Sequence, residues 1–148
     1  MEPTPLLHIL LIEDNKEDIS LLQQALREST LPYQMSVVED GEQALAFLRQ
    51  NGSHPKTPQP DLIIFNLSPS QIDRFDVLRT LRTTLEWKTI PMMIFAGVLW
   101  EKDYEQATAH GVERCLQKPV LFAEYLAVGE DIAVWWQLRA RPHFSRVG

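Results

Sequence analysis

The chain of 148 residues contains a single cysteine, Cys115, and no long run of hydrophobic residues. One cysteine excludes an internal disulfide and a metal site built from several thiolates, and it is typical of a reducing compartment. The hydrophobic runs are far shorter than the ~20 residues that a membrane-spanning helix needs. Residues 1–6 also lack the basic start and the hydrophobic stretch of a secretory signal. These absences predict a cytoplasmic protein that does not cross a membrane.

Basic residues are scarcer than acidic ones, and the common phosphate-binding motifs are missing. The 14 Lys and Arg against 20 Asp and Glu give a net charge of -6, which disfavours general binding to nucleic acid. Neither G-x-G-x-x-G nor G-x-x-x-x-G-K-[ST] follows a strand-like segment, so a nucleotide-binding loop is not expected.

Short hydrophobic segments alternate with segments of helical periodicity. Hydrophobic runs bounded by acids or turn residues predict buried strands, and spacings of three and four predict amphipathic helices. Asp73 is a plausible N-cap for the third helix, Gly111 ends the fourth, and residues 51–60 form an exposed loop. We expect strands at 7–12, 34–38, 60–66, 90–95 and 112–117, and helices at 16–28, 42–49, 73–83, 101–110 and 120–138.

Five β-α units of similar size predict an α/β fold. The alternating order implies a five-stranded parallel sheet with helices on both faces. Right-handed crossovers favour the flavodoxin-like strand order 2-1-3-4-5, which places a site beyond the carboxyl ends of strands one and three. The length suits one domain, so we expect residues 1–148 to be a single domain with a core at about 6–138 and a basic tail at 139–148.

Charged and amide side chains follow three of the expected strands. Glu13 and Asp14 follow the first strand, Asn66 ends the third, and Lys118 follows the fifth. Carboxylates are oxygen ligands of the kind that Mg²⁺ binds, and lysine offers a positive charge to an anion or to the acids. An acidic pair alone is common in solvated loops, but the joint placement favours a functional crevice.

Asn66 stands where an aspartate could accept a phosphoryl group. A carboxylate oxygen is a nucleophile for that transfer, whereas the amide nitrogen lone pair is delocalised and the group carries no negative charge. Asp14 and Ser68 are the nearest substitutes, but no base that would activate the serine is evident. We therefore expect no catalytic residue and no enzyme activity.

Six segments resemble those of response-regulator receiver domains, along nearly the whole chain. They are I-L-L-I-E-D-N, D-G-E-Q-A-L, P-D-L-I-I-F-N-L, F-D-V-L-R, I-P-M-M-I-F and L-Q-K-P-V. The proline-rich loop at 51–60 and the aromatic end of the last helix are similar to single-domain regulators that partner cyanobacterial phytochromes. The resemblance implies two-component signalling, with a histidine kinase or a photoreceptor kinase as the partner.

The resemblance also implies a role for each site position. In the family, the strand-one acids and a strand-three aspartate hold Mg²⁺, and the aspartate takes a phosphoryl group from a histidine kinase. A hydroxyl residue that ends strand four and a lysine after strand five contact that phosphoryl group. An aromatic residue on strand five turns inward in concert.

This chain keeps the two acids and the lysine but departs at the other switching positions. Asn66 replaces the acceptor, Ala96 stands at the hydroxyl position, and Cys115 stands at the aromatic position. Arg74 also occupies a position where glycine is usual. The phosphoryl acceptor and the hydroxyl and aromatic residues that respond to phosphorylation are lost together. This predicts a pseudo-receiver that acts by docking to another protein.

Asn66 also weakens the expected metal site at Asp14 and Glu13. The two carboxylates and Lys118 leave a local charge of -1, against -2 with an aspartate at position 66. Each unit charge contributes up to ~4 kcal/mol at about 4 Å in an effective dielectric near 20. We expect Lys118 to neutralise part of the acid pair, Mg²⁺ to bind weakly, and no cofactor to be required.

The last helix carries two hydrophobic stripes, of which one should cover the sheet. The other is either left for a partner or packs on the adjoining helix. Together with the aromatic residues of the fourth helix it predicts a homodimer through helices four and five and strand five. The residues of this expected surface are Trp100, Tyr104, Leu121, Tyr125, Val128, Ile132 and Trp135.

Two alternatives stay open. The first is a phosphorylatable response regulator that uses a modified site in a histidine-kinase or phytochrome phosphorelay. The second is an unrelated small α/β enzyme, which the lack of a nucleophile-base pair disfavours.

Overall fold

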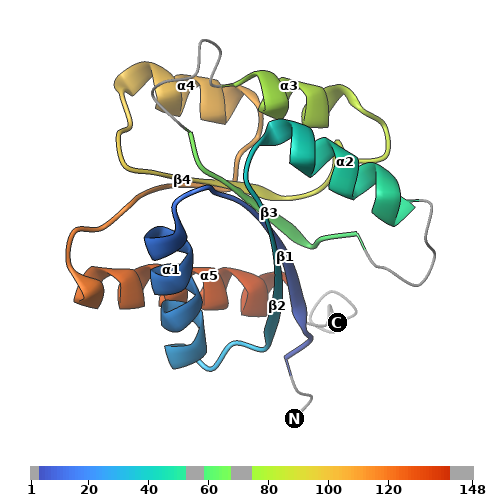
Figure 1. The fold of residues 1–148 in the computed structure, drawn as a ribbon. Coiled ribbons are helices and arrows are strands. Elements are labelled where there is room, and N and C mark those ends of the chain that lie inside the picture. The colour runs from blue at the N-terminus through green and yellow to red at the C-terminus, as the bar shows by residue number, and fades with distance from the viewer. Residues whose placement is uncertain (1–3, 53–58, 68–74, 141–148) are drawn as a thin grey trace, which may run out of the picture.

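A computed structural model describes residues 4–52, 59–67 and 75–140 of the chain. All strand pairs are parallel, in the order β2-β1-β3-β4-β5, which confirms the predicted α/β fold (Figure 1). The strands are β1 (Leu7–Ile12), β2 (Tyr33–Val38), β3 (Leu62–Phe65), β4 (Met92–Ala96) and β5 (Arg114–Gln117). The helices are α1 (Lys16–Glu28), α2 (Gly41–Gly52), α3 (Asp76–Thr83), α4 (Glu101–Ala109) and α5 (Phe122–Arg139).

The helices cover both faces of the sheet. Helices α1 and α5 lie on one face, and α2, α3 and α4 lie on the other (Figure 1). Successive side chains of a strand point to opposite faces, so Ile9 of β1 joins the cluster under α1 and α5 while Leu10 joins the cluster under α2, α3 and α4. Because both faces are covered, β3 and β4 are hydrophobic without interruption, and β1 is interrupted only by the partly buried His8.

Helices α1 and α5 approach each other closely at a glycine. A Cβ atom built on Gly129 of α5 would lie 2.6 Å from the carbonyl oxygen of Ala25 in α1. At the far end of α5, the indole nitrogen of Trp136 donates a hydrogen bond of 2.8 Å to the carbonyl oxygen of Pro5. The two helices and the segment before β1 therefore form one packed unit.

The ends of two helices differ in how well the sequence predicted them. Gly111 follows α4 with φ of +67°, the left-handed conformation that glycine adopts at little cost. Helix α3 begins at Asp76 with Phe75 as its N-cap residue, three residues later than expected. The expected N-cap, Asp73, lies outside the described residues.

Two segments expected to be irregular contain helical or buried residues. Helix α2 continues to Gly52, and Pro60 is buried just before β3, so 51–60 is not an exposed loop at either end. The expected tail begins inside α5, because Arg139 is the last residue of that helix. Residues 53–58 and 141–148 lie outside the described residues.

The expected partner surface is wrong at four of its seven residues. Trp100 and Tyr104 are each 46% exposed and Leu121 is 64% exposed. The rest belong to the core under α1 and α5, because most of the hydrophobic residues of α5 turn inward against the sheet and α1. The buried residues are Tyr125 at 2% exposure, Val128 at 9%, Ile132 at 1% and Trp135 at 7%.

The outward side of α5 carries exposed hydrophobic residues that the expected partner surface did not include. Val134 is 47% exposed and Leu138 is 62% exposed. No helix in the described part of the chain is long and hydrophobic enough to span a membrane.

Candidate functional site

Three strand ends bring the predicted site residues together. Glu13 follows β1 and Asn66 follows β3, where the Asn66 amide nitrogen donates to the carbonyl oxygen of Ile12 at 3.1 Å. Lys118 follows β5, and its amide nitrogen donates to the carbonyl oxygen of Ala96 at 2.8 Å. These ladder bonds hold the three residues at one edge of the sheet, as expected for parallel strands.

Both carboxylate oxygens of Glu13 are engaged. The side chain is only 2% exposed, and its Oε1 lies 2.6 Å from Lys118 Nζ. Its Oε2 accepts a hydrogen bond of 3.0 Å from Asn66 Nδ2 and one of 3.2 Å from the Asn15 amide nitrogen. A buried carboxylate needs such partners because burial removes its hydration.

Lys118 is held between two carboxylates. Besides Glu13, its Nζ donates to Asp18 Oδ2 at 2.8 Å, and its side chain is 13% exposed. The ammonium also lies 5.8 Å from the ring centre of Phe95. Burial by itself would lower the pKa of Lys118, but hydrogen bonds and attraction to Asp18 and Glu13 outweigh it and raise the pKa. The lysine therefore stays charged and fixed in the crevice.

The second partner of Lys118 belongs to a network that the sequence did not reveal. Tyr125 Oη donates to Asp18 Oδ1 at 3.1 Å, and the Asp18 amide nitrogen donates to Asn15 Oδ1 at 2.9 Å. Burial, and then the charge and hydrogen bond of Asp18, raise the pKa of Tyr125. Helical spacing placed Asp18 and Tyr125 on helices, but only the packing of α1 on α5 brings them into contact.

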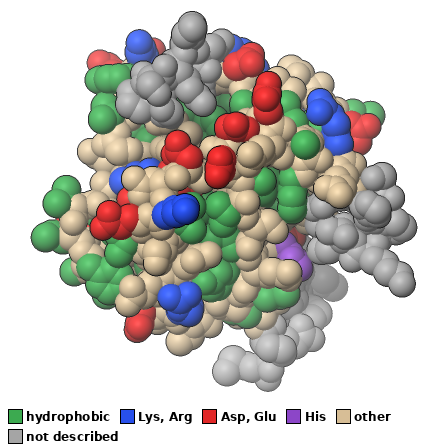
Figure 2. Space-filling model, in the orientation of Figure 1, with side chains coloured by type: hydrophobic (Ala, Val, Ile, Leu, Met, Phe, Trp, Pro, Cys, Tyr) green, Lys and Arg blue, Asp and Glu red, His purple; other side chains and the backbone are tan. Residues whose placement is uncertain are grey.

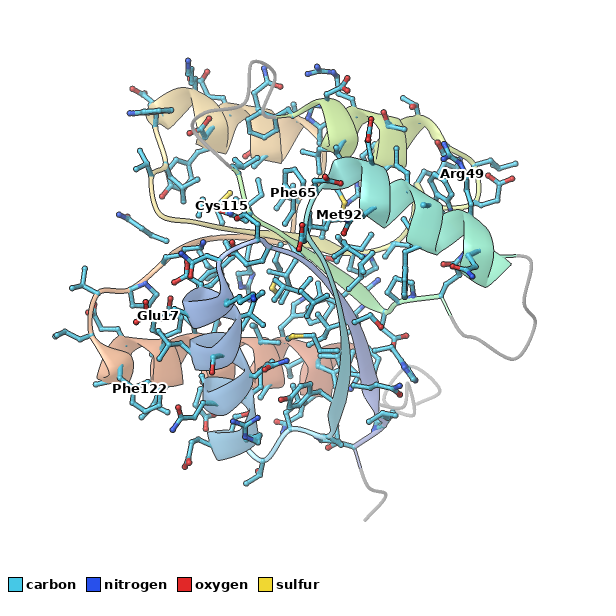
Figure 3. The ribbon with its side chains drawn as sticks, in the orientation of Figure 1. Glu17, Arg49, Phe65, Met92, Cys115 and Phe122 are labelled. Carbon is cyan, nitrogen blue, oxygen red and sulfur yellow. The ribbon has the colours of Figure 1, made fainter. Side chains whose placement is uncertain are left out.

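The acid pair after β1 is split. Glu13 is buried while the next residue, Asp14, is exposed to solvent. The exposed acids Asp14 and Glu17 add negative charge near the crevice, and Figure 3 labels Glu17 at the start of α1. Acidic side chains also gather across the face of the molecule shown in Figure 2. A negative field of this kind attracts cations.

The two remaining predicted positions lack the side-chain groups that the family resemblance implies for them. Ala96 is fully buried at the end of β4 and has no hydroxyl group. Cys115 is partly buried against the cluster under α2, α3 and α4. Burial, and then the charge of Asp103, raise the pKa of its thiol, so it stays protonated. Ser68 and Arg74 lie outside the described residues.

A divalent cation does not fit this crevice as the side chains are arranged. Lys118 Nζ already lies at hydrogen-bond distance from Glu13 Oε1, and Asn66 donates to the other oxygen. A cation bound to Glu13 would compete with Lys118 at Oε1 or with Asn66 at Oε2. Within residues 4–52, 59–67 and 75–140, no three His, Cys, Asp or Glu side chains are grouped to hold a metal ion.

The chain is similar to curated response regulators. It is 36% identical to response regulator Rcp1 of Synechocystis sp. over 93 residues, which make up 63% of this chain and 63% of that protein. The matched part therefore spans less than two thirds of the length of that relative.

Two solved structures share the fold over most of their length. The phosphorylated cyanobacterial phytochrome response regulator RcpA superposes with a TM-score of 0.79 at 31% identity, covering 93% of this chain and 98% of that one. The Mn²⁺-bound form of Rcp1 superposes with a TM-score of 0.74 at 29% identity, covering 87% of this chain and 93% of that one.

The model of the response regulator receiver domain matches residues 9–128, which contain most of β1, the other four strands and the crevice residues. Three observations lead to the same conclusion. They are the order of the parallel strands, the placement of Glu13, Asn66 and Lys118, and the sequence match. The chain belongs to the response regulator receiver domain family.

Proposed function

We propose that this receiver domain is a pseudo-receiver, which acts in two-component signalling by docking to another protein without aspartyl phosphorylation. The contact of Asn66 with Glu13 carries the proposal. The amide presents a donor to Glu13 Oε2 at 3.0 Å, where a phosphoryl acceptor would need a free carboxylate oxygen.

The surroundings of Asn66 support the same function. Lys118, the cation that would pair with a phosphoryl group, is already bound to Glu13 and Asp18. Ala96 offers no side-chain donor to a phosphoryl oxygen. The carboxylate that would accept a phosphoryl group and the hydroxyl that would contact it are both absent. This is the pattern expected when the scaffold serves binding alone.

The similarity to phytochrome response regulators supports a histidine kinase or a photoreceptor kinase as the docking partner. We propose the cytoplasm as the site of this interaction. We also propose a homodimer through the face of α4, β5 and α5, where Trp100, Tyr104 and Leu121 are exposed.

Intact-mass spectrometry after incubation with acetyl phosphate and Mg²⁺ tests the absence of phosphorylation. We expect no phosphoryl adduct on this protein, while RcpA, which has been crystallised in phosphorylated form, serves as the positive control. A stable adduct would contradict the proposal. Its location on Asp14, the exposed acid of the crevice, would favour a phosphorylatable regulator with a modified site.

Analytical ultracentrifugation tests the proposed dimer. We expect a concentration-dependent dimer in the unmodified protein and a monomer in the double variant Trp100→Ser, Tyr104→Ser, because that change removes exposed aromatic area from the proposed interface. Leu85→Ser, which alters an exposed residue of the α3–β4 connection, is the control. A monomer at all concentrations in the unmodified protein would contradict the dimer.

A further inference from the structure

A groove of about 520 Å³ lies beside β5 at the start of α5, the end of α5 that Figure 3 marks with Phe122. Its lining is largely hydrophobic, with Pro119 and Val120 from the β5–α5 connection and Ala127 and Val128 from α5. The groove is open to solvent, because Val120 is 94% exposed and Ala127 is exposed as well. An open hydrophobic groove of this kind can receive a side chain of another molecule.

The rim of the groove carries a negative charge. Glu124 lines the groove and is exposed. The ammonium of Lys118, which also lines it, is already held by Glu13 and Asp18. A side chain that enters the groove is therefore favoured when it is hydrophobic and comes with a positive charge beside it.

Trp100 of the same chain has both properties. Its side chain is large and hydrophobic, and it is 46% exposed at the start of α4. Lys102 is exposed, and its Nζ lies 5.6 Å from the centre of the Trp100 ring. Tryptophan is among the residues that most often anchor protein interfaces, so a second copy of this chain offers a suitable occupant for the groove.

The fold places Trp100 and the groove so that two copies can exchange them. Ala96 pairs with Gln117, so the connections that follow β4 and β5 leave the sheet at the same level. Helices α4 and α5 cover opposite faces of the sheet (Figure 1), and β5 is its outer strand. A two-fold axis beside β5 and parallel to it therefore brings α4 of one copy opposite α5 of the second.

We propose that Trp100 of one copy binds in the groove of a second copy, where Lys102 faces Glu124. Two-fold symmetry makes both contacts twice, because the same surface serves on each copy. The inference rests on the homodimer proposed above and adds which parts of the two copies meet.

Charge reversal tests this arrangement, with the dimer dissociation constant measured by sedimentation equilibrium. Lys102→Glu and Glu124→Lys should each raise that constant about tenfold, because each creates two like-charge contacts across the interface. The double variant Lys102→Glu, Glu124→Lys should return to within about threefold of the unmodified protein. Glu124→Lys also removes a hydrogen bond from the Leu121 amide nitrogen, but recovery in the double variant excludes that loss as the cause.

Matched controls reverse exposed charges outside both parts of the interface. Glu28→Lys at the end of α1 and Lys88→Glu in the α3–β4 connection should leave the dissociation constant unchanged. A dimer that the reversals at positions 102 and 124 do not weaken, or that the double variant does not recover, would overturn the inference and leave the homodimer standing. A monomer at all concentrations would overturn both and leave the groove to another protein.

Discussion

At position 66, a carboxylate in place of the amide would turn an attractive contact with Glu13 into a repulsive one. Asn66 Nδ2 donates to Glu13 Oε2 at 3.0 Å, so the amide relieves the buried carboxylate. A carboxylate at that distance would meet a repulsion of about 5 kcal/mol in an effective dielectric near 20, before any relaxation. The residue that we propose prevents phosphoryl transfer therefore also stabilises the crevice.

Asn66→Asp should lower the free energy of unfolding by about 1–3 kcal/mol in the presence of a chelator, because it replaces a hydrogen bond by charge repulsion. Added Mg²⁺ should recover part of the loss, since a cation between the two carboxylates screens them. Urea denaturation measures both effects. Asn15→Asp is the matched control, because asparagine and aspartate are equally good at an N-cap. Equal stability of the Asn66→Asp variant and the unmodified protein would contradict the repulsion.

We expect Lys118 and Tyr125 to influence the stability of the protein at alkaline pH. Both pKa values are raised in the folded state, so each group contributes stability that is complete below its unfolded pKa of about 10. That contribution is lost as pH rises through the folded pKa, because the unfolded chain then releases protons more readily. Stability should thus fall above about pH 10.

Tyr125→Phe should make that alkaline fall shallower, because it removes one of the two groups. At neutral pH, the variant should lose about 1 kcal/mol with the hydrogen bond to Asp18. Urea denaturation between neutral and alkaline pH tests this, and Tyr104→Phe on the exposed side of α4 is the control. An identical pH profile in the Tyr125→Phe variant would show that Tyr125 does not contribute.

At the scale of elements, the contact between α1 and α5 determines where the network can form. Asp18 and Tyr125 lie 107 residues apart in sequence and meet because the two helices pack side by side on the same face of the sheet. Gly129 permits this approach, since the space of a side chain is taken by the backbone of Ala25. The hydrophobic residues of α5 then serve the core, which is why four of them were wrongly assigned to a partner surface.

Gly129→Ala should destabilise the protein by about 1–3 kcal/mol, because the added methyl group forces α1 and α5 apart. The intrinsic preference for alanine in helices would act in the opposite direction by about 1 kcal/mol, so a measured loss reports the contact. Thermal unfolding measures it. Gly97→Ala is the control, since nothing lies within 4 Å of a Cβ atom there. A more stable Gly129→Ala variant would contradict the close approach.

At the scale of the whole molecule, the receiver fold contains a crevice in which Lys118 is paired with Glu13 and Asp18. Lys118 links the ends of β1 and β5 to α1, and Tyr125 continues the link to α5. The Lys118 ammonium therefore occupies one oxygen of Glu13, an acid that the family resemblance assigns to a metal ion.

Millimolar Mg²⁺ should leave the melting temperature nearly unchanged, because a ligand stabilises a protein only when its concentration exceeds its dissociation constant. Differential scanning fluorimetry with and without Mg²⁺ measures this. Rcp1, which has been crystallised with Mn²⁺, is the comparison and should show a clear rise. A similar rise in this protein would show that the cation displaces Lys118 from Glu13.

The sequence by itself determined the strands, the helices, their order and the meeting of Glu13, Asn66 and Lys118 at one edge. Hydrophobic periodicity fixes the elements, and parallel strands of a known order bring their carboxyl ends to one place. Segment ends were less certain, as the late start of α3 shows, because capping depends on local contacts that spacing does not encode.

Only the tertiary structure decided which groups pair and which faces are buried. Asp18 and Tyr125 carry no sequence signal for their contact, since it depends on how closely α1 and α5 pack. The same packing distance turned Ile132 and Trp135 inward, because a helix that is hydrophobic on several sides can bury any of them. Periodicity states that a helix has a hydrophobic side, but the shape and distance of its neighbours decide which side is covered.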